Sequence, residues 1–134
     1  MIKEVRYRAY DKRNNIKIES FHLNTINFDQ QCVELWHEDM GDYVLWFKDV
    51  VLVQYVGLKD KYNVEIYEGD CVEFEFSNET KRGFVEFKGG SFQITTKEKI
   101  GNQNVSHLFG YSSSRNHKVI GNIFQGDDLN DEIV

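Results

Sequence analysis

The chain has 134 residues, a formal net charge of −6 and no proline. This length suffices for a domain with its own hydrophobic core, so disulfide staples are not required. The acidic balance argues against broad nonspecific affinity for polyphosphate, and the missing proline excludes PxxP ligands and proline-rich linkers. The 10 Phe, 7 Tyr and 2 Trp, beside only 2 Met, favour half-buried β-sheet surfaces over helix faces.

The first expected strand covers residues 4–10, where apolar and polar side chains alternate. Its expected inward residues are Val5, Tyr7 and Ala9, and its expected outward residues are Arg6, Arg8 and Tyr10. The polar residues 11–15 predict a turn, and residues 16–21 predict the hairpin partner.

The next part, residues 22–42, has irregular spacing that does not separate strand from helix. We interpret residues 32–36 as a strand, joined by an acidic hairpin loop over 37–42 to a second strand over 43–47. The apolar run 50–56 predicts a strand buried on both faces.

The C-terminal half predicts a meander of short strands. The strands expected there are 71–76, 83–88, 91–96 and 118–124, with loops over 77–82 and 97–106 and a loose acidic tail over 125–134. Gly89-Gly90 suits a two-residue type I′ or II′ hairpin turn. With the strand that ends near Gly57, five strands have the proportions of a small barrel.

Three segments resemble the YopX family, small proteins of bacteriophages and prophages of low-GC bacteria. The strongest match is VQYVGLKDKYNVEIYEGDCVEF, residues 53–74, and the others are RYRAYDK, residues 6–12, and VIGNIF, residues 119–124. Tyr62-Asn63-Val64 replaces the family's Asn-Gly, so Asn63 is expected to take the left-handed backbone position. The closing segment lacks the family's proline.

The resemblance implies a mainly β fold with a C-terminal SH3-like small barrel of about five strands, preceded by an N-terminal β-hairpin region. It implies no established activity. We therefore expect one YopX-like domain, divided into an N-terminal β region over 1–50, a barrel over 51–124 and an acidic tail over 125–134.

Five residues are interpreted as structural turn positions rather than as chemistry. These are Gly57, Gly69, Asp70, Gly89 and Gly90. Glycine supplies a positive φ at such turns, and an aspartate can accept backbone N–H bonds that fix the start of a strand.

The polar clusters of the sequence lack the spacing that catalysis or metal binding requires. His37, Glu38, Asp39 and Asp42 match neither an HExxH helix nor an EF-hand loop. Cys32 and Cys71 form no paired short spacing for zinc, and no GxSxG motif surrounds residues 112–114. We expect no catalytic residue, no metal and no cofactor.

Two surfaces are candidates for binding. Trp36 and Trp46 flank one predicted hairpin and could anchor a protein interface. Near the N-terminus, residues that could bind single-stranded nucleic acid are Arg6, Arg8, Tyr10, Lys12 and Arg13. The alternative interpretation of Arg6 and Arg8 is the solvated face of an amphipathic strand, paired with acidic neighbours.

The sequence thus predicts a non-enzymatic phage or prophage accessory protein that binds a protein or itself as a homo-oligomer. With no apolar run of 18 residues and only two distant cysteines, we expect it in the host cytoplasm with reduced thiols and without a membrane segment. The alternatives are a nucleic-acid-binding small barrel that uses the first strand and a small metal-dependent hydrolase that uses residues 37–42.

Overall fold

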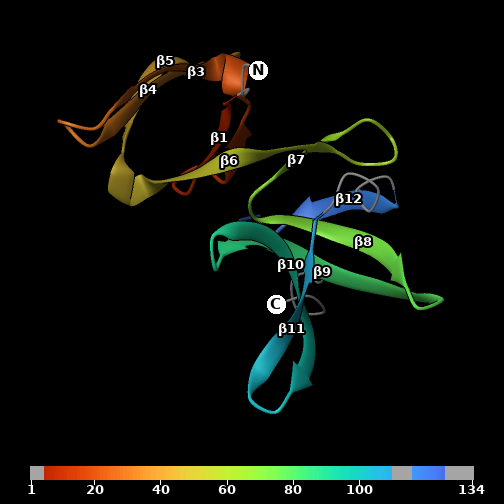
Figure 1. The fold of residues 1–134 in the computed structure, drawn as a ribbon. Coiled ribbons are helices and arrows are strands. Elements are labelled where there is room, and N and C mark those ends of the chain that lie inside the picture. Colours follow the sequence, from red (N-terminus) through yellow and green to blue (C-terminus); the bar gives the residue numbers. More distant parts are fainter. Residues whose placement is uncertain (1–4, 110–115, 126–134) are drawn as a thin grey trace. The chain divides into compact units, whose positions relative to one another are not determined.

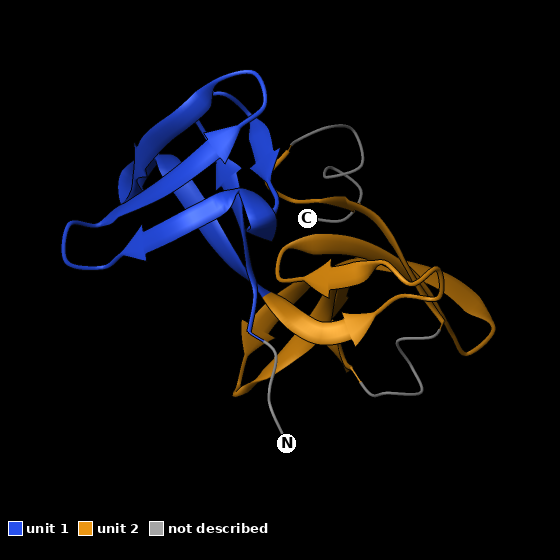
Figure 2. Cartoon of the chain, turned by 90° about the horizontal axis from the view of Figure 1, so that it is seen from above, with its two compact units in different colours: residues 1–54 blue, residues 55–134 orange. Residues whose placement is uncertain are grey.

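A computed structural model describes residues 5–109 and 116–125 of the chain. The fold is mainly β, as the sequence predicts, with antiparallel sheets and two short 3-10 helices among the described residues. The chain separates into two compact units, residues 1–54 and residues 55–134, coloured separately in Figure 2.

Unit 1 contains two small sets of strands, of which β1, β3, β4, β5 and β6 are labelled in Figure 1. Its elements are β1 (Tyr7–Asp11), β2 (Ile16–Ile18), η1 (Ser20–His22), β3 (Leu23–Asn27), β4 (Cys32–His37), β5 (Gly41–Trp46), η2 (Phe47–Asp49) and the first half of β6 (Val50–Lys59). β1 pairs with β2 and with β6, while β4 pairs with β3 and β5. The hairpins over β1–β2 and β4–β5 confirm the order expected from the sequence.

The core of unit 1 is formed by apolar side chains from β1, β2, β4, β5 and the start of β6. Its fully buried members include Ala9, Ile18, Val33, Leu35 and Leu45. Within β4, Val33 and Leu35 therefore point inward, whereas Glu34 between them is exposed. This period-2 burial explains why β3, β4 and β5 have a separate outer face.

The ten-residue strand β6 begins in unit 1 and ends in unit 2. Its first residues, Val50–Gln54, pair with β1, and Tyr55 and Lys59 pair with β7. Gly57 has a φ of 93° and lies where the β6–β7 register shifts. The strand thus continues past the end expected near Gly57, because this residue forms a bulge within β6 rather than a terminating turn.

Unit 2 is built on a curled five-stranded sheet in the order β11-β10-β9-β8-β12 (Figure 1). Its strands are β7 (Glu65–Tyr67), β8 (Asp70–Phe76), β9 (Glu79–Lys88), β10 (Ser91–Ile100), β11 (Gln103–Leu108) and β12 (His117–Asn122). The core includes Ile66, Val72, Phe74, Val85 and Ile94. Four strands of this sheet match expected ones, but the fifth is β11 and not the strand that ends near Gly57.

Several turn residues adopt the expected conformations. Gly89 and Gly90 have φ values of 62° and 86°, which confirms a type I′ turn between β9 and β10. Gly69 has a φ of 88°, and the Asp70 carboxylate accepts the Tyr67 backbone N–H at 2.9 Å. Asn63 has a φ of 67°, as predicted.

Two expected loops of the C-terminal half are instead tight hairpins. The loop predicted over 77–82 reduces to Ser77-Asn78, because both residues adopt a positive φ, of 52° and 63°. The loop predicted over 97–106 forms the ends of β10 and β11, which pair Lys99 with Asn104 around a turn at Gly101. Most polar residues of this segment therefore lie in strands, where several are exposed to solvent, and not in the loop that the sequence predicted. The predicted tail lies, after residue 125, outside the described residues.

Each unit contains one buried cysteine. Cys32 lies in β4 and Cys71 in β8, and the two do not form a disulfide. Cys71 is fully buried and packs as a small apolar residue. Among residues 5–109 and 116–125, no helix is long and apolar enough to cross a membrane.

Candidate functional site

The outer face of β3, β4 and β5 carries both tryptophans. Trp36 lies opposite Asp42, and Cys32 lies opposite Trp46, so the two tryptophans project from the same side of the β4–β5 hairpin. Trp36 is half-buried, with its ring edge-on to His22 at a centroid distance of 4.6 Å. Trp46 is 50% exposed. The structure therefore separates the two candidates and leaves Trp46 as the solvent-facing one.

Further apolar side chains are exposed around Trp46. Val44, two residues earlier on β5, is 47% exposed, and Phe28, just after β3, is 72% exposed. The Phe28 ring contacts the Phe47 ring edge-on at a centroid distance of 6.0 Å, and Phe47 follows Trp46 in the chain. We call Phe28, Val44 and Trp46 the Trp46 patch. A hollow of about 370 Å³ adjoins it, lined by Gln30, Gln31, Trp46, Phe47 and Lys48.

The Trp46 patch is held in place by backbone bonds around it. The Phe47 N–H donates to the Gln31 carbonyl at 2.8 Å, which ties the end of β5 to the β3–β4 turn. In that turn, the Gln30 N–H donates to the Asn27 side chain at 2.9 Å. Both turns at this end of the sheet are therefore fixed, and the patch is presented on a rigid support.

The first strand differs from the surface that the sequence predicts. Arg8 and Tyr10, expected to face outward, are buried, with 9% and 3% exposure. The Arg8 guanidinium lies 3.3 Å from the Glu19 carboxylate, as the alternative interpretation of an acid-paired arginine implies. Four consecutive residues of β1, Arg8–Asp11, are buried, so the alternation of residue types in this strand does not separate a wet face from a dry one.

The other three predicted nucleic-acid-binding residues differ in exposure from the buried Arg8 and Tyr10. Lys12 and Arg13 are exposed in the β1–β2 turn, and Arg6 is half-buried. The turn is organised by Asp11, whose carboxylate accepts the N–H groups of Arg13 and Asn14. The structure therefore does not bring the five predicted nucleic-acid residues onto one accessible groove.

Asp11 also connects the turn to β5. It accepts the Tyr43 hydroxyl at 3.1 Å, and burial together with this hydrogen bond raises the pKa of Tyr43. Asp11 is buried, so the contact is structural support for the hairpin and not a surface feature.

The acidic loop after β4 does contain an ordered side-chain contact. His22 Nε2 lies 2.9 Å from Glu38 Oε1, and this hydrogen bond is the main cause that lowers the pKa of Glu38. Sequence reasoning grouped Glu38 with His37 and missed His22, because His22 lies in η1, 16 residues earlier. Within the described residues, no group of three or more His, Cys, Asp or Glu side chains is arranged to hold a metal ion.

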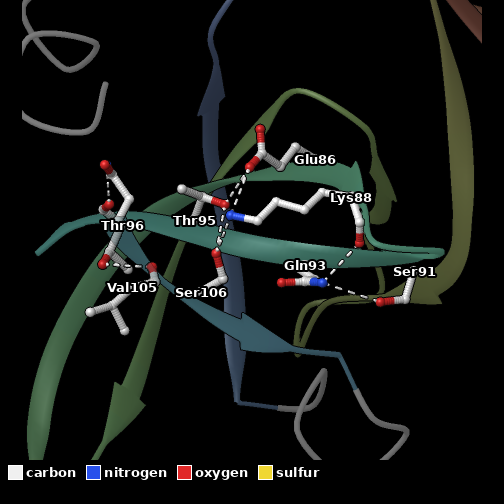
Figure 3. Close-up of polar contacts among 9 residues, drawn as sticks. Glu86, Lys88, Ser91, Gln93, Thr95, Thr96, Val105 and Ser106 are labelled. Atoms are coloured by element: carbon white, nitrogen blue, oxygen red, sulfur yellow. Dashed lines mark hydrogen bonds and ion pairs between the residues drawn. The ribbon is translucent and has the colours of Figure 1, made fainter. Parts of the chain in front are cut away.

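A polar ladder in unit 2 was also not foreseen from the sequence. Thr95 donates to Glu86 at 2.7 Å and lies 3.1 Å from Ser106, while Lys88 donates to Ser106 at 3.1 Å (Figure 3). These side chains come from β9, β10 and β11 on the face opposite Val85 and Ile94. Lys88 also lies 3.7 Å from the Glu86 carboxylate, so this lysine is an ion-pair partner and not a free base beside the serine. Residues 112–114 lie outside the described residues.

The fold and these sites define a mainly β protein with two units, an exposed aromatic patch and several internal polar networks. A family model described as YopX protein matches residues 6–129, and the chain belongs to this family. A search of curated proteins gave no match.

Two solved structures are similar to the chain over almost its whole length. A crystal structure of a protein from Enterococcus faecalis matches with a TM-score of 0.63 and 20% identity, covering 96% of this chain and 99% of the other. The YopX protein of Bacillus subtilis matches with a TM-score of 0.60 and 15% identity, covering 92% and 96%. At these identities the likeness shows a shared fold.

Proposed function

We propose that this chain is a non-enzymatic accessory protein of a bacteriophage or prophage that binds another protein in the host cytoplasm. The Trp46 patch is the proposed contact surface. The observation that carries the proposal is the half-exposed Trp46 on a rigid sheet, with the exposed Val44 two residues earlier on β5 and the exposed Phe28 in contact with the neighbouring Phe47.

The energetics of interfaces support this choice. Trp46 is absent from the buried core of unit 1, which Val33, Leu35 and Leu45 supply. Tryptophan is enriched at protein interfaces, where its burial can contribute about 2 kcal/mol or more. Exposed apolar side chains in a contiguous group indicate an interaction site more often than isolated ones do.

The position of β5 supports a protein as the partner. β5 is an edge strand of the β3-β4-β5 sheet, so an extended segment of a partner could pair with its backbone while contacting Val44 and Trp46. The partner proposed is a different protein, and a second copy of the chain is the competing outcome of the same test.

The experiment compares wild type with Trp46→Ala in capture from host lysate, with and without nuclease treatment, and in concentration-dependent light scattering. A protein that co-purifies with wild type and is lost with Trp46→Ala is the expected result. Trp36→Phe serves as the matched control, since Trp36 packs on His22 and should leave capture unchanged. Loss of a concentration-dependent oligomer in Trp46→Ala would identify a second copy as the partner.

Two outcomes would refute the proposal. One is capture that persists unchanged in a folded Trp46→Ala protein. The other is capture that disappears with nuclease, because the recovered protein would then have been linked through nucleic acid.

A further inference from the structure

An exposed tyrosine in unit 2 attracts two lysines from separate segments. Tyr62, in the loop between β6 and β7, is 63% exposed. The Lys61 Nζ lies 5.4 Å from the centre of its ring, and the Lys118 Nζ, from β12, lies 5.9 Å from it. Both distances are within the range of cation–π attraction.

The loop that carries Tyr62 is held rigidly. The buried Asp60 carboxylate accepts the N–H groups of Tyr62 at 2.8 Å, Val64 at 2.9 Å and Val119 at 2.9 Å. The Lys61 N–H donates to the His117 carbonyl at 2.9 Å. The backbone beside Tyr62 is thus ordered before any ligand arrives, which reduces the entropy cost of binding.

Two acidic residues that neighbour these lysines, one across a strand pair and one along the chain, already have hydrogen-bond partners. Glu73 lies opposite Lys118 across the β8–β12 pair, but its carboxylate is bound to Arg82 at 3.0 Å. The carboxylate of Asp60, which precedes Lys61, already accepts hydrogen bonds from backbone N–H groups. Within the described part of the chain, no ion pair joins Lys61 or Lys118 to a carboxylate, in contrast to Lys81 and Lys88.

We propose that Lys61, Tyr62 and Lys118 form a binding site for single-stranded nucleic acid. On binding, the two ammonium groups move from the Tyr62 ring to backbone phosphate, and the ring face that they leave stacks on a base. Lys61 and Lys118 form no ion pair with a carboxylate of the described residues, so phosphate is a suitable partner for their charges. The exposed Tyr62 ring on a rigid loop can stack on a base, which an acidic peptide does not offer. The site lies in different residues from the Trp46 patch, so the two proposals succeed or fail separately.

The test measures fluorescence anisotropy of a labelled oligothymidylate of about ten nucleotides at low salt, where phosphate contacts are strongest. Lys61→Ala/Lys118→Ala should weaken binding and make the slope of log K against log salt shallower by about 1.4, at about 0.7 per lost phosphate contact. Tyr62→Ala should weaken binding at least about fivefold, and Tyr62→Phe should retain it, because stacking needs the ring alone.

Lys17→Ala/Lys88→Ala is the control, since it changes the net charge equally but removes lysines that are paired with Glu19 and Glu86. This control should bind as wild type does. The proposal is overturned if wild type does not bind at low salt, or if both double variants lose affinity equally. It is also overturned if an acidic peptide competes fully and Tyr62→Ala has no effect. All substituted side chains are exposed or at the surface, and circular dichroism checks that each variant is folded.

Discussion

The carboxylate of Asp60 accepts the backbone N–H of Val119 at 2.9 Å, across 59 residues of sequence. Its other oxygen accepts the N–H groups of Tyr62 and Val64. One buried side chain therefore shapes the loop after β6 and fixes it to the last strand of the sheet. The segment that carries the strongest resemblance to the YopX family is thus a structural junction.

Asp60→Ala is expected to lower the free energy of unfolding by about 3 kcal/mol, because three backbone N–H groups lose their acceptor. Asp60→Asn should cost less, since the amide retains one accepting oxygen. Urea unfolding measures both. Asp29→Ala, at an exposed aspartate in the β3–β4 turn, is the control and should lie within about 0.5 kcal/mol of wild type. An Asp60→Ala protein as stable as wild type would contradict this role.

Gly83→Ala is expected to destabilise the β9–β10 pair by about 2 kcal/mol through overpacking. A Cβ at this position would meet the Thr95 carbonyl oxygen at 2.5 Å and Ile94 Cγ2 at 2.7 Å. The carbonyl belongs to a paired strand and cannot move without disturbing it. Thermal unfolding measures the effect, and an unchanged melting temperature would show that the two strands can separate locally at little cost.

The pKa of His107 should lie below its usual value of 6.5, because burial lowers it, and repulsion from Lys81 does so too, against a smaller attraction from Glu98. NMR titration of its ring protons measures this pKa directly. Lys81→Met should raise it by removing the repulsion while keeping the aliphatic stem. A value at or above 6.5 in wild type would contradict the burial of the ring.

The stability effect of His107 follows from the same shift. As pH falls below 6.5, the unfolded chain binds the proton before the folded chain does, so the contribution is present above pH 6.5 and is lost as pH falls through the folded pKa. Between neutral and mildly acidic pH, the free energy of unfolding should therefore decrease less in His107→Gln than in wild type. An equal loss in the variant would assign the pH dependence to other groups.

The two tryptophans should differ in fluorescence. In Trp36→Phe the remaining Trp46, which is 50% exposed, should emit at longer wavelength and be quenched strongly by acrylamide. In Trp46→Phe the remaining Trp36, packed on His22, should emit at shorter wavelength and be quenched less. Equal quenching of the two single-tryptophan proteins would mean that the Trp46 patch is covered in solution.

Much of the fold could be predicted because hairpin turns have local rules. Gly89-Gly90 and Asn63 adopt the positive φ values that their residue types allow. The β10–β11 hairpin was missed because Lys97, Glu98 and Lys99 have no apolar alternation, and the hydrogen bond from the Asn104 side chain to the Thr96 carbonyl cannot be seen in a sequence.

The candidate sites were less predictable, since exposure depends on which strands cover each face. Arg8 and Trp36 were predicted as exposed binding residues, yet Arg8 is buried beside Glu19, and Trp36 is half-buried with its ring against His22. The convergence of Lys61 and Lys118 on Tyr62 needs a tertiary contact between a loop and β12. Spacing along the chain contains no signal for it.

The buried thiols of Cys32 and Cys71 give the chain one chemical reporter for each unit. A thiol reagent can reach Cys32 only when unit 1 opens and Cys71 only when unit 2 opens. Mass spectrometry under native conditions measures the two alkylation rates. Equal rates would indicate that the two units unfold together, and different rates would indicate that each unit opens independently.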